Sequence, residues 1–583
     1  MGIAPKQFEG RKIYQPGVYS KSYYPPQTGN NGAITNVVAV IGKAFGGIPY
    51  NANLDDMLKV NVITNLSQAL NLLRGGDGYY MTEFFLTPTT DEALNKPTQV
   101  LFFRVDPATQ SESKIKDSTG INDIIQLKSV RYGSYANQIC RKIEAGTVTG
   151  KSITVKLAGE VVASKDNIGY ECIDIQYIGG GTSCTMTINS NGLTTSVGGA
   201  SGDDLNLLFA DYKNVGDLVS YISALPSYSC IAKCNLDFST KNLDAVTAVD
   251  IMTGVYTIRA DIQAIIDFFN STGELEATLV GDRVPVGNDA NYVFQTGGSE
   301  GIATATDWAK TFELMEKYYI NHILVATGDP IVHALAKSHC SKMSSIEHKK
   351  NRTWASGASS GKTKAERIAE AKALNDARGI YFSTPFYRYD YPNGGTKKLF
   401  APYLAAAFDA GIRYANHITI SSTFKKPNIL ATSEQYSYED KDDYIKNGCT
   451  IIALNETGLY EIVHCISTYQ SANLILNLPS MLRTCDFITL DSQIKIKDKI
   501  ANLDRAPNAL VIKSIENYLT SNLLPYYRDN GFLTDDPNNG AKAFSEVSFS
   551  VQGDAFYFGF TGIVPAPMHY GFITQRFTVV GQL

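Results

Sequence analysis

HILVATGDPIVHALAKSHCSKM, residues 322–343, places a short apolar strand directly before a segment with helical spacing. Alternation of strand and helix is typical of a parallel sheet that is covered by helices. We therefore expect an α/β domain over residues 296–448. The same patterns alternate on both sides of the quoted stretch: TDWAKTFELMEKYY at 306–319, KAERIAEAKALNDA at 364–377, GIYFSTP at 379–385 and APYLAAAFDAGI at 401–412.

Residues 35–112 carry further core patterns. An apolar run at 37–41 leads into the glycine-rich stretch GKAFGGIP, which predicts a buried strand followed by a sharp turn. QVLFFRV at 99–105 is a second apolar strand. LSQALNLLR at 66–74 has helical spacing, with Ser67 as its candidate cap. This region is expected to form the first part of the core.

The sequence texture changes between residues 113 and 205. Short runs such as SITVKL, CIDIQYI and TMTI are separated by Gly, Asn, Ser and Thr, which predicts an inserted β-rich domain. Residues 206–295 return to helical spacing in DLVSYISAL and in VYTIRADIQAIIDFF, and we interpret them as a mixed α/β segment.

The C-terminal region, residues 449–572, is predicted to be an α+β domain. TIIALN and LYEIVHCI read as a hairpin around ETG, and two helical stretches follow within 486–524. VSFSV at 547–551 and FYFGF at 556–560 alternate strictly and predict a second hairpin.

Both chain ends are interpreted as arms. Residues 1–34 are rich in Gly, Pro, Tyr and Asn, which predicts an extended arm. Residues 573–583 contain the strand pattern RFTVV, which we expect to lack a partner within its own domain.

Composition narrows the class of function. The hydrophobic fraction of 44% and the charged fraction of 19% are those of a folded multidomain protein. The net charge is -5 without a dense basic run, so we expect no direct nucleic-acid binding. We find no apolar window that would span a bilayer, and nine scattered Cys suggest reduced thiols. The 34 Tyr against 2 Trp favour self-association.

SGASSGKT at 356–363 is similar to a phosphate-binding loop, because glycine amides and a Lys can hold phosphate. Its spacing is wrong, since Ser356 stands where the motif requires Gly. The preceding SIEHKKNRTWA also reads as charged and polar rather than as a buried strand. We interpret the motif as a surface loop that caps helix 364–377, and a P-loop nucleotide-binding enzyme remains the less favoured alternative.

The side chains of metal-ligand type that cluster in sequence are His333, His339, Cys340 and His348, and their spacing matches no zinc motif. His333 and His339 are six apart, so on a helix they occupy different faces, and packing is the favoured role. Cys230 and Cys234 read as small buried apolar residues. We predict no metal, no cofactor and no catalytic residue, and therefore no enzyme.

Several segments together resemble the tail sheath proteins of contractile bacteriophages and related injection machines. Their order along the chain carries the resemblance more than any single motif. They are PGVYS at 16–20, IGKAFGGIP at 41–49, YGSYANQI at 132–139, TGGSEG at 296–301 with DW at 307–308, KLFAPYLAAAFDAGI at 398–412 and the hairpin NGCTIIAL…YEIVHCIST.

The resemblance implies an architecture and a function. The fold would be a multidomain α/β protein with a central, non-catalytic, subtilisin-like layer, an outer β-rich insertion, a C-terminal α+β domain facing a tube, and extended arms. The chain would polymerise with itself as stacked hexameric rings around the tail tube and contract to deliver the genome. Its other partners would be baseplate and tail terminator proteins, and its place the virion tail, assembled in the host cytoplasm. The sheath of a bacteriocin or other contractile injection system is the alternative.

The resemblance also implies two sets of contact residues. Strands at 12–20 and 574–580 would join neighbouring subunits, with Tyr14, Val18, Tyr19, Arg576, Phe577 and Val579 in those strands. The run KIKDKIANLDR would face the tube through Lys495, Lys497, Lys499 and Arg505. An ordinary solvated charged helix face is an equally weighted interpretation of that run.

Overall fold

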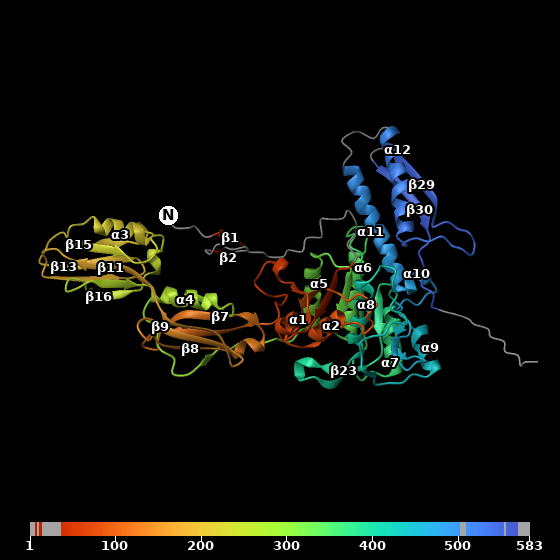
Figure 1. The fold of residues 1–583 in the computed structure, drawn as a ribbon, viewed down its shortest axis with the longest axis horizontal. Coiled ribbons are helices and arrows are strands. Elements are labelled where there is room, and N and C mark those ends of the chain that lie inside the picture. The colour runs from red at the N-terminus through yellow and green to blue at the C-terminus, as the bar shows by residue number, and fades with distance from the viewer. Residues whose placement is uncertain (1–5, 9–10, 14–35, 502–508, 553–554, 570–583) are drawn as a thin grey trace, which may run out of the picture. The chain divides into compact units, whose positions relative to one another are not determined.

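A computed structural model of the chain describes residues 6–8, 11–13, 36–501, 509–552 and 555–569 (Figure 1). The chain divides into two compact units. One unit consists of residues 1–23 and 108–301, and the other of residues 24–107 and 302–583.

The second unit is built around a seven-stranded sheet, in which each strand is parallel to its neighbours except for the edge strand β4. This confirms the parallel sheet that the alternating patterns predict, and the chain has a mixed α/β multidomain fold. The strands in spatial order are β26 (Cys449–Thr450), β22 (Gly379–Phe382), β21 (Thr353–Gly357), β20 (His322–Val325), β3 (Val38–Gly42), β5 (Val100–Arg104) and β4 (Asn61–Ile63).

Helices cover both faces of this sheet. In β3, Val38 and Val40 point into one core with α2 (Asp77–Leu86) and α8 (Ala406–Ala415), while Ala39 and Ile41 point into the other. The second core is closed by α5 (Ala305–Met315), α6 (Pro330–Met343) and α7 (Lys364–Leu374). Because both faces are buried, these strands read as continuous apolar runs in the sequence.

Helix α1 (Leu66–Leu73) corrects one detail of the sequence analysis. Its cap is Asn65, whose side-chain oxygen accepts a hydrogen bond from the backbone N–H of Gln68 at 2.8 Å, whereas Ser67 lies inside the helix. An Asn before the helix satisfies an N–H that has no partner in the first turn.

The first unit is rich in β-structure and has two apolar cores. One core is lined by β6 (Gln110–Lys116), β7 (Asp123–Tyr132), β8 (Ile139–Ala145), β9 (Lys151–Leu157), β10 (Glu160–Ile168), β18 (Leu275–Leu279) and α4 (Asp261–Ser271). Strand β19 (Val293–Phe294) pairs with β8 at the edge of that sheet. The other contains β11 (Glu171–Tyr177), β12 (Ser183–Ile188), β13 (Gly192–Gly198), β14 (Asn206–Leu208), β15 (Tyr228–Ala232), β16 (Val246–Asp250), β17 (Tyr256–Arg259) and α3 (Val215–Ser223).

Strand β17 shows that the helical interpretation of VYTIRADIQAIIDFF was wrong in its first part. Tyr256–Arg259 pair antiparallel with β11, and helix α4 starts only at Asp261. The two elements follow each other almost without a turn, so a helical window placed over both of them conceals the strand.

The C-terminal part of the second unit holds two hairpins and a stack of helices. β27 (Ile452–Leu454) pairs with β28 (Tyr460–Ile462), and β29 (Phe544–Gln552) pairs with β30 (Ala555–Gly562), which confirms both predicted hairpins. The helices are α9 (Tyr438–Lys446), α10 (Leu474–Asn477), α11 (Pro479–Ala501), α12 (Ala509–Tyr518), a π-helical turn (Leu519–Leu523) and α13 (Leu524–Asp529). Within the described ranges, the structure contains no helix that is both long and apolar enough to cross a membrane.

Candidate functional site

The hairpin β29–β30 lies at the end of the second unit beside α12 and is coloured dark blue in Figure 1. Phe549 faces Phe558 across the two strands, and both rings pack onto the helical core that contains Leu523 and Tyr527. On the other face, Tyr557 is 55% exposed. The alternating sequence therefore produces a hairpin with one face on the core and one face in solvent.

The outer edges of this hairpin carry no further strand among the residues that the structure describes, since β29 and β30 form a sheet of two. An edge strand presents a row of backbone N–H and C=O groups that can pair with another chain. Two such edges on an ordered platform make this hairpin the candidate site for added strands.

The helices beneath the hairpin hold the first of the predicted tube-facing lysines. Lys495 Nζ lies 2.9 Å from Asp491 Oδ2 within α11 and 3.6 Å from the centre of the Tyr526 ring. Asp491 is fully buried and also accepts a hydrogen bond from the Tyr527 hydroxyl at 3.0 Å. Burial and the neighbouring carboxylate raise the pKa of the Tyr527 phenol. The Lys495 ammonium is thus engaged inside its own subunit.

The other residues of that predicted set are less constrained. Lys497 lies two residues further along α11, on a different face of the helix, and is exposed. Lys499 belongs to the same helix, but its side chain lies outside the described residues, as does Arg505. Lys497 is therefore the member of the set whose side chain is described as open to solvent.

The predicted arm strands fall largely outside the described residues. Lys6–Phe8 (β1) and Arg11–Ile13 (β2) pair with each other in an antiparallel hairpin. The residues predicted to join neighbouring subunits, Tyr14, Val18, Tyr19, Arg576, Phe577 and Val579, lie outside the described ranges.

The structure corrects the setting of the phosphate-loop-like segment. Thr353–Gly357 form the fully buried strand β21 in the middle of the parallel sheet, although their sequence reads as polar. The polar groups are satisfied internally, because the Ser356 hydroxyl lies 2.9 Å from the Val325 carbonyl oxygen and Thr353 Oγ1 lies 2.8 Å from His322 Nδ1. A buried strand therefore does precede the loop.

The polar side chains of the loop form contacts within the same subunit. Lys362 Nζ lies 2.6 Å from a carboxylate oxygen of Glu370. Thr363 and Glu366 form a capping box at the start of α7, which confirms the predicted capping role of this loop. The Lys362 ammonium is therefore paired with a carboxylate of α7, and Thr363 serves as the N-cap of that helix.

The three members of the His and Cys set that lie on α6 are used for packing, whereas His348 lies beyond the helix with its Nδ1 3.2 Å from the Ser345 hydroxyl. His333 is buried, and its Nε2 lies 2.9 Å from the Thr327 carbonyl oxygen. His339 Nε2 accepts a hydrogen bond from Arg352 at 2.7 Å, and burial with that positive charge lowers the pKa of His339 to about 3. Cys340 is buried as well. In the described part of the chain, no group of three or more His, Cys, Asp or Glu could hold a metal ion.

Sequence reasoning missed a buried charged pair on α8. Asp409 and Arg413, one helical turn apart, form a bidentate pair at 2.8 and 2.6 Å, and both side chains are fully buried. The Ser422 hydroxyl donates a further hydrogen bond to Asp409. Nearby charge and hydrogen bonds hold the pKa of Asp409 below its ordinary value. The spacing of four residues is visible in FDAGIR, but the burial is not.

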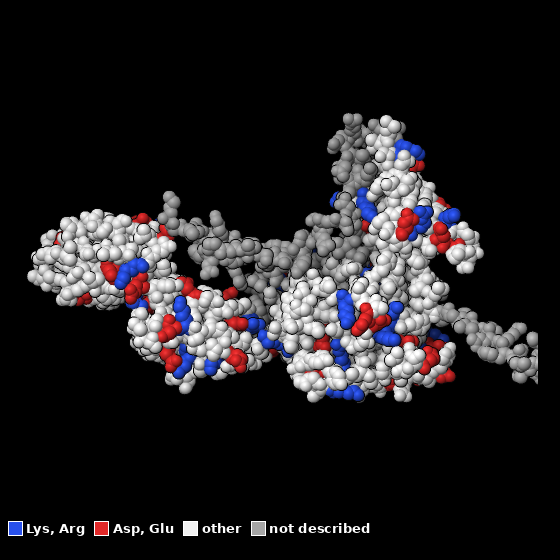
Figure 2. Space-filling model, in the orientation of Figure 1, with Lys and Arg blue, Asp and Glu red and all other residues white. Residues whose placement is uncertain are grey.

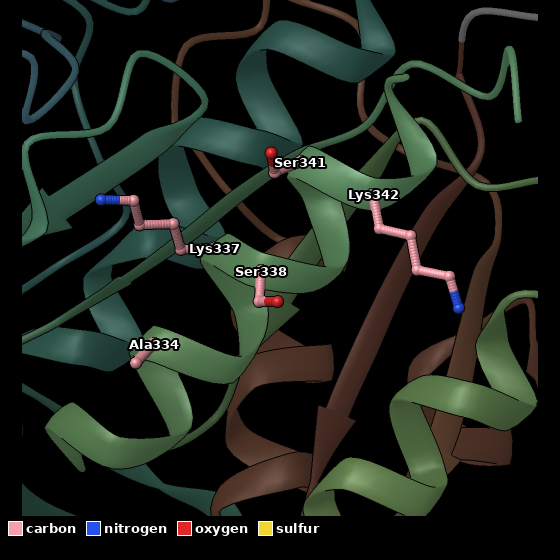
Figure 3. A pocket seen from close by; sticks show the side chains of 5 residues that line it. All are labelled: Ala334, Lys337, Ser338, Ser341 and Lys342. Carbon is pink, nitrogen blue, oxygen red and sulfur yellow. The ribbon is translucent and has the colours of Figure 1, made fainter. Parts of the chain in front are cut away.

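A hollow of about 550 Å³ runs along the outer face of α6 (Figure 3). Lys337 and Lys342 point away from each other, and their ammonium groups lie 2.5 Å from the Leu374 carbonyl oxygen and 2.7 Å from a Glu316 carboxylate oxygen. Both positive charges are already used within the subunit, so the hollow lacks the convergent polar groups of a ligand site.

Comparison with known proteins identifies the class to which this architecture corresponds. No protein-family model matches the chain. The chain is 22% identical over 592 residues to the tail sheath protein of Bacillus phage SP01, covering 98% of this chain and 96% of that protein.

Two crystal structures of sheath tail proteins share the fold. The protein of Desulfitobacterium hafniense matches with a TM-score of 0.54 at 11% identity, over 94% of this chain and 100% of that chain. The protein of Listeria innocua matches with a TM-score of 0.53 at 11% identity, over 91% and 96%.

The fold is therefore that of tail sheath proteins, a class of structural proteins rather than enzymes. The predicted resemblance to the contractile bacteriophage tail sheath family is confirmed.

Proposed function

We propose that this chain is the subunit of a contractile phage tail sheath, which polymerises as stacked hexameric rings around the tail tube. Contraction of the array drives the tube through the host envelope for genome delivery. The similarity to the phage SP01 tail sheath protein along nearly the whole chain supports this function. In the proposal, the protein resides in the virion tail, is assembled in the host cytoplasm, and contacts the tube, baseplate and tail terminator proteins.

The observation that carries the proposal is the two-stranded sheet β29–β30 with its open edges. The arm strands of neighbouring subunits, at 12–20 and 574–580, would add to these edges. RFTVV has the alternating pattern of a strand that pairs at a sheet edge. Its addition would pair its backbone N–H and C=O groups with those of the hairpin edge. At about 1 kcal/mol net per hydrogen bond, one added strand contributes a few kcal/mol, and the array multiplies that contribution.

In this proposal residues 449–572 face the tube, and the β-rich region 113–205 lies on the outside of the array. Lys497, Lys499 and Arg505 are the tube-facing candidates. Lys495 has a weaker claim, because its ammonium already pairs with Asp491. Exposed charge pairs are individually weak, which suits a contact that must be released during contraction.

We also propose that the α/β core is a subtilisin-like layer without catalytic residues. A parallel sheet with helices on both faces supports this idea. An activity-based fluorophosphonate probe for serine hydrolases should leave the protein unlabelled, and stoichiometric labelling of a serine would contradict the proposal.

Deletion of residues 1–20 tests the arm contact. The truncated chain should keep the thermal unfolding midpoint of the full chain and lose ordered tubes in electron micrographs, because the first arm strand is gone. Normal polymerisation of the truncated chain would overturn the arm contact.

The alternative, the sheath of a bacteriocin or other injection system, is distinguished from a phage sheath by the particle that contains it and not by the subunit itself. Purified particles that contain this chain should carry a DNA-filled head. Headless particles with the same sheath would favour the alternative injection system.

A further inference from the structure

The outer face of a small sheet in the second unit carries two tyrosines, and a further exposed tyrosine follows directly after it in the chain. This sheet consists of β24 (Thr396–Phe400), β23 (Phe386–Asp390) and β25 (Ala431–Thr432). Side chains alternate between its two faces. Tyr389 and Leu399 on the outer face are 44% and 48% exposed, and Tyr391, in the 3-10 turn that follows β23, is 61% exposed with its ring centroid 6.3 Å from that of Tyr389. We call these three residues, together with Tyr387 and Lys397, the tyrosine face.

The inner face of the same sheet is fixed to the core. Phe386 and Phe400 stack at 5.8 Å within the main apolar cluster. Arg388 is buried over the Phe84 ring at 4.7 Å, and Asp390 accepts a hydrogen bond from the Tyr80 hydroxyl at 2.7 Å. The tyrosine face is therefore preformed, so a partner would meet an ordered surface and little ordering entropy would be lost.

Lys397 adds an unneutralised positive charge to this face. Its ammonium lies 4.5 Å from the centre of the Tyr387 ring, and within the described ranges it forms no ion pair. Strand β24 carries two lysines and no acid, a formal charge of +2. Lys398 is already paired with Asp390 at 3.1 Å, so Lys397 is the charge that a partner would meet.

The opposite charge lies on helix α9 of the same unit. Its sequence YEDKDDYIK has four acids and two lysines, so its net formal charge is -4 + 2 = -2. Lys364 binds Asp440 and Asp443 at 2.6 and 2.8 Å, while Glu439 and Asp442 form no ion pair in the part of the chain that is described. Tyr438 at the start of α9 is 77% exposed and brings an aromatic ring to the same end.

The strands that carry the tyrosine face and helix α9 lie at different places on the second unit. In Figure 1, β23 lies below the α/β body and α9 at its right, and Figure 2 shows acidic side chains at the place of α9. Two different, complementary patches on one subunit produce a head-to-tail contact, which closes into a ring or continues as a helix. A pairing of identical patches would instead stop at a dimer.

We propose that the tyrosine face of one copy docks against helix α9 of the next copy, with Lys397 meeting the acids Glu439 and Asp442. This inference rests on the proposed self-assembly and names the lateral contact within it. Tyrosine suits such an interface because it buries a large apolar area and keeps a polar hydroxyl. Opposite charges fix which copy meets which, whereas like charges brought together disfavour the contact.

A charge exchange tests the contact. Lys397→Glu and Asp442→Lys should each raise the protein concentration needed for tube formation about tenfold or more, because each brings like charges together. The double variant should return that concentration to within about threefold of the wild type. Lys213→Glu, a reversal at an exposed lysine of the other unit, is the matched control and should have no effect.

Light scattering measures the onset of assembly, and thermal unfolding of each unassembled variant verifies that the fold is intact. Single variants that assemble like the wild type, or a double variant that is no better than the singles, would overturn the contact. Wild-type protein that forms no tubes at all would instead contradict the proposed function, so the two failures are distinguishable.

Discussion

Phe549 of β29 and Phe558 of β30 face each other across the hairpin and both contact the helical core below it. Cross-strand aromatic pairs stabilise a sheet, and a two-stranded hairpin is only marginally stable without such support. The pair thus fixes a two-stranded platform whose outer edges carry no further strand in the described part of the chain.

The first prediction concerns this platform. Phe558→Ala should lower the free energy of unfolding by about 1–3 kcal/mol, less than for a fully buried phenylalanine, because the ring is half-buried. Urea denaturation measures the change. Tyr557→Ala is the matched control on the exposed face and should change it by about 0.5 kcal/mol or less. Equal losses in the two variants would show that the hairpin does not depend on its inner face.

The second prediction separates two lysines of α11. Lys495→Gln should destabilise the protein, because Asp491 would remain buried without its cation. Lys497→Gln should leave the unfolding midpoint unchanged, because its side chain is exposed. Thermal unfolding of both variants gives the comparison. A larger loss for Lys497→Gln would contradict the assignment of Lys495 to an internal pair.

The third prediction concerns the buried pair on α8. Asp409→Asn should destabilise the protein by about 3–5 kcal/mol, because it leaves the Arg413 charge buried and uncompensated. Asp529→Asn removes a surface partner of Arg528 and should cost about 0–1 kcal/mol. Chemical denaturation of both variants measures the two losses of unfolding free energy. An Asp409→Asn variant as stable as the wild type would refute the role of the buried carboxylate.

The fourth prediction is a pH dependence. His464 and His569 lie with ring centroids 4.8 Å apart, and burial followed by the charge of His569 lowers the pKa of His464 to about 4. The unfolded chain takes up a proton at about pH 6.5, whereas the folded chain does not until about pH 4. The free energy of unfolding is therefore unaffected by His464 above about pH 6.5. It falls as the pH decreases from there toward 4, by at most about 1.4 kcal/mol per pH unit for this group.

A His464→Gln variant provides the measurement for that dependence. The slope of unfolding free energy against pH between 6.5 and 4.5 should be shallower in the variant than in the wild type. Identical slopes would mean that His464 does not titrate as its burial requires.

The main sheet was largely predictable, for a physical reason. Strands such as β3 and β20 are buried on both faces, so their sequences are continuous apolar runs. Strand β21 was missed because its Ser356 and Thr353 are satisfied by carbonyl and imidazole partners that come from distant segments. At Gly357 a Cβ would lie 2.2 Å from the Phe382 carbonyl oxygen, a requirement for glycine that spacing alone does not reveal.

The candidate site was predictable in outline and not in its contacts. Strict alternation in FYFGF predicted the hairpin and its two faces. The internal role of Lys495 depends on Tyr526 and Tyr527, about thirty residues further along the chain, and a local charge pattern contains no sign of them. The tyrosine face requires knowledge of which strand face is buried, and the β24–β23 register supplies it.

Electron microscopy of the purified full chain, compared with a variant that lacks residues 573–583, tests the central claim most directly. The account predicts hollow tubes for the full chain and dispersed, folded subunits for the variant, because the strand RFTVV no longer reaches a neighbour. Dispersed subunits from the full chain at every concentration, or equally ordered tubes from both proteins, would contradict it.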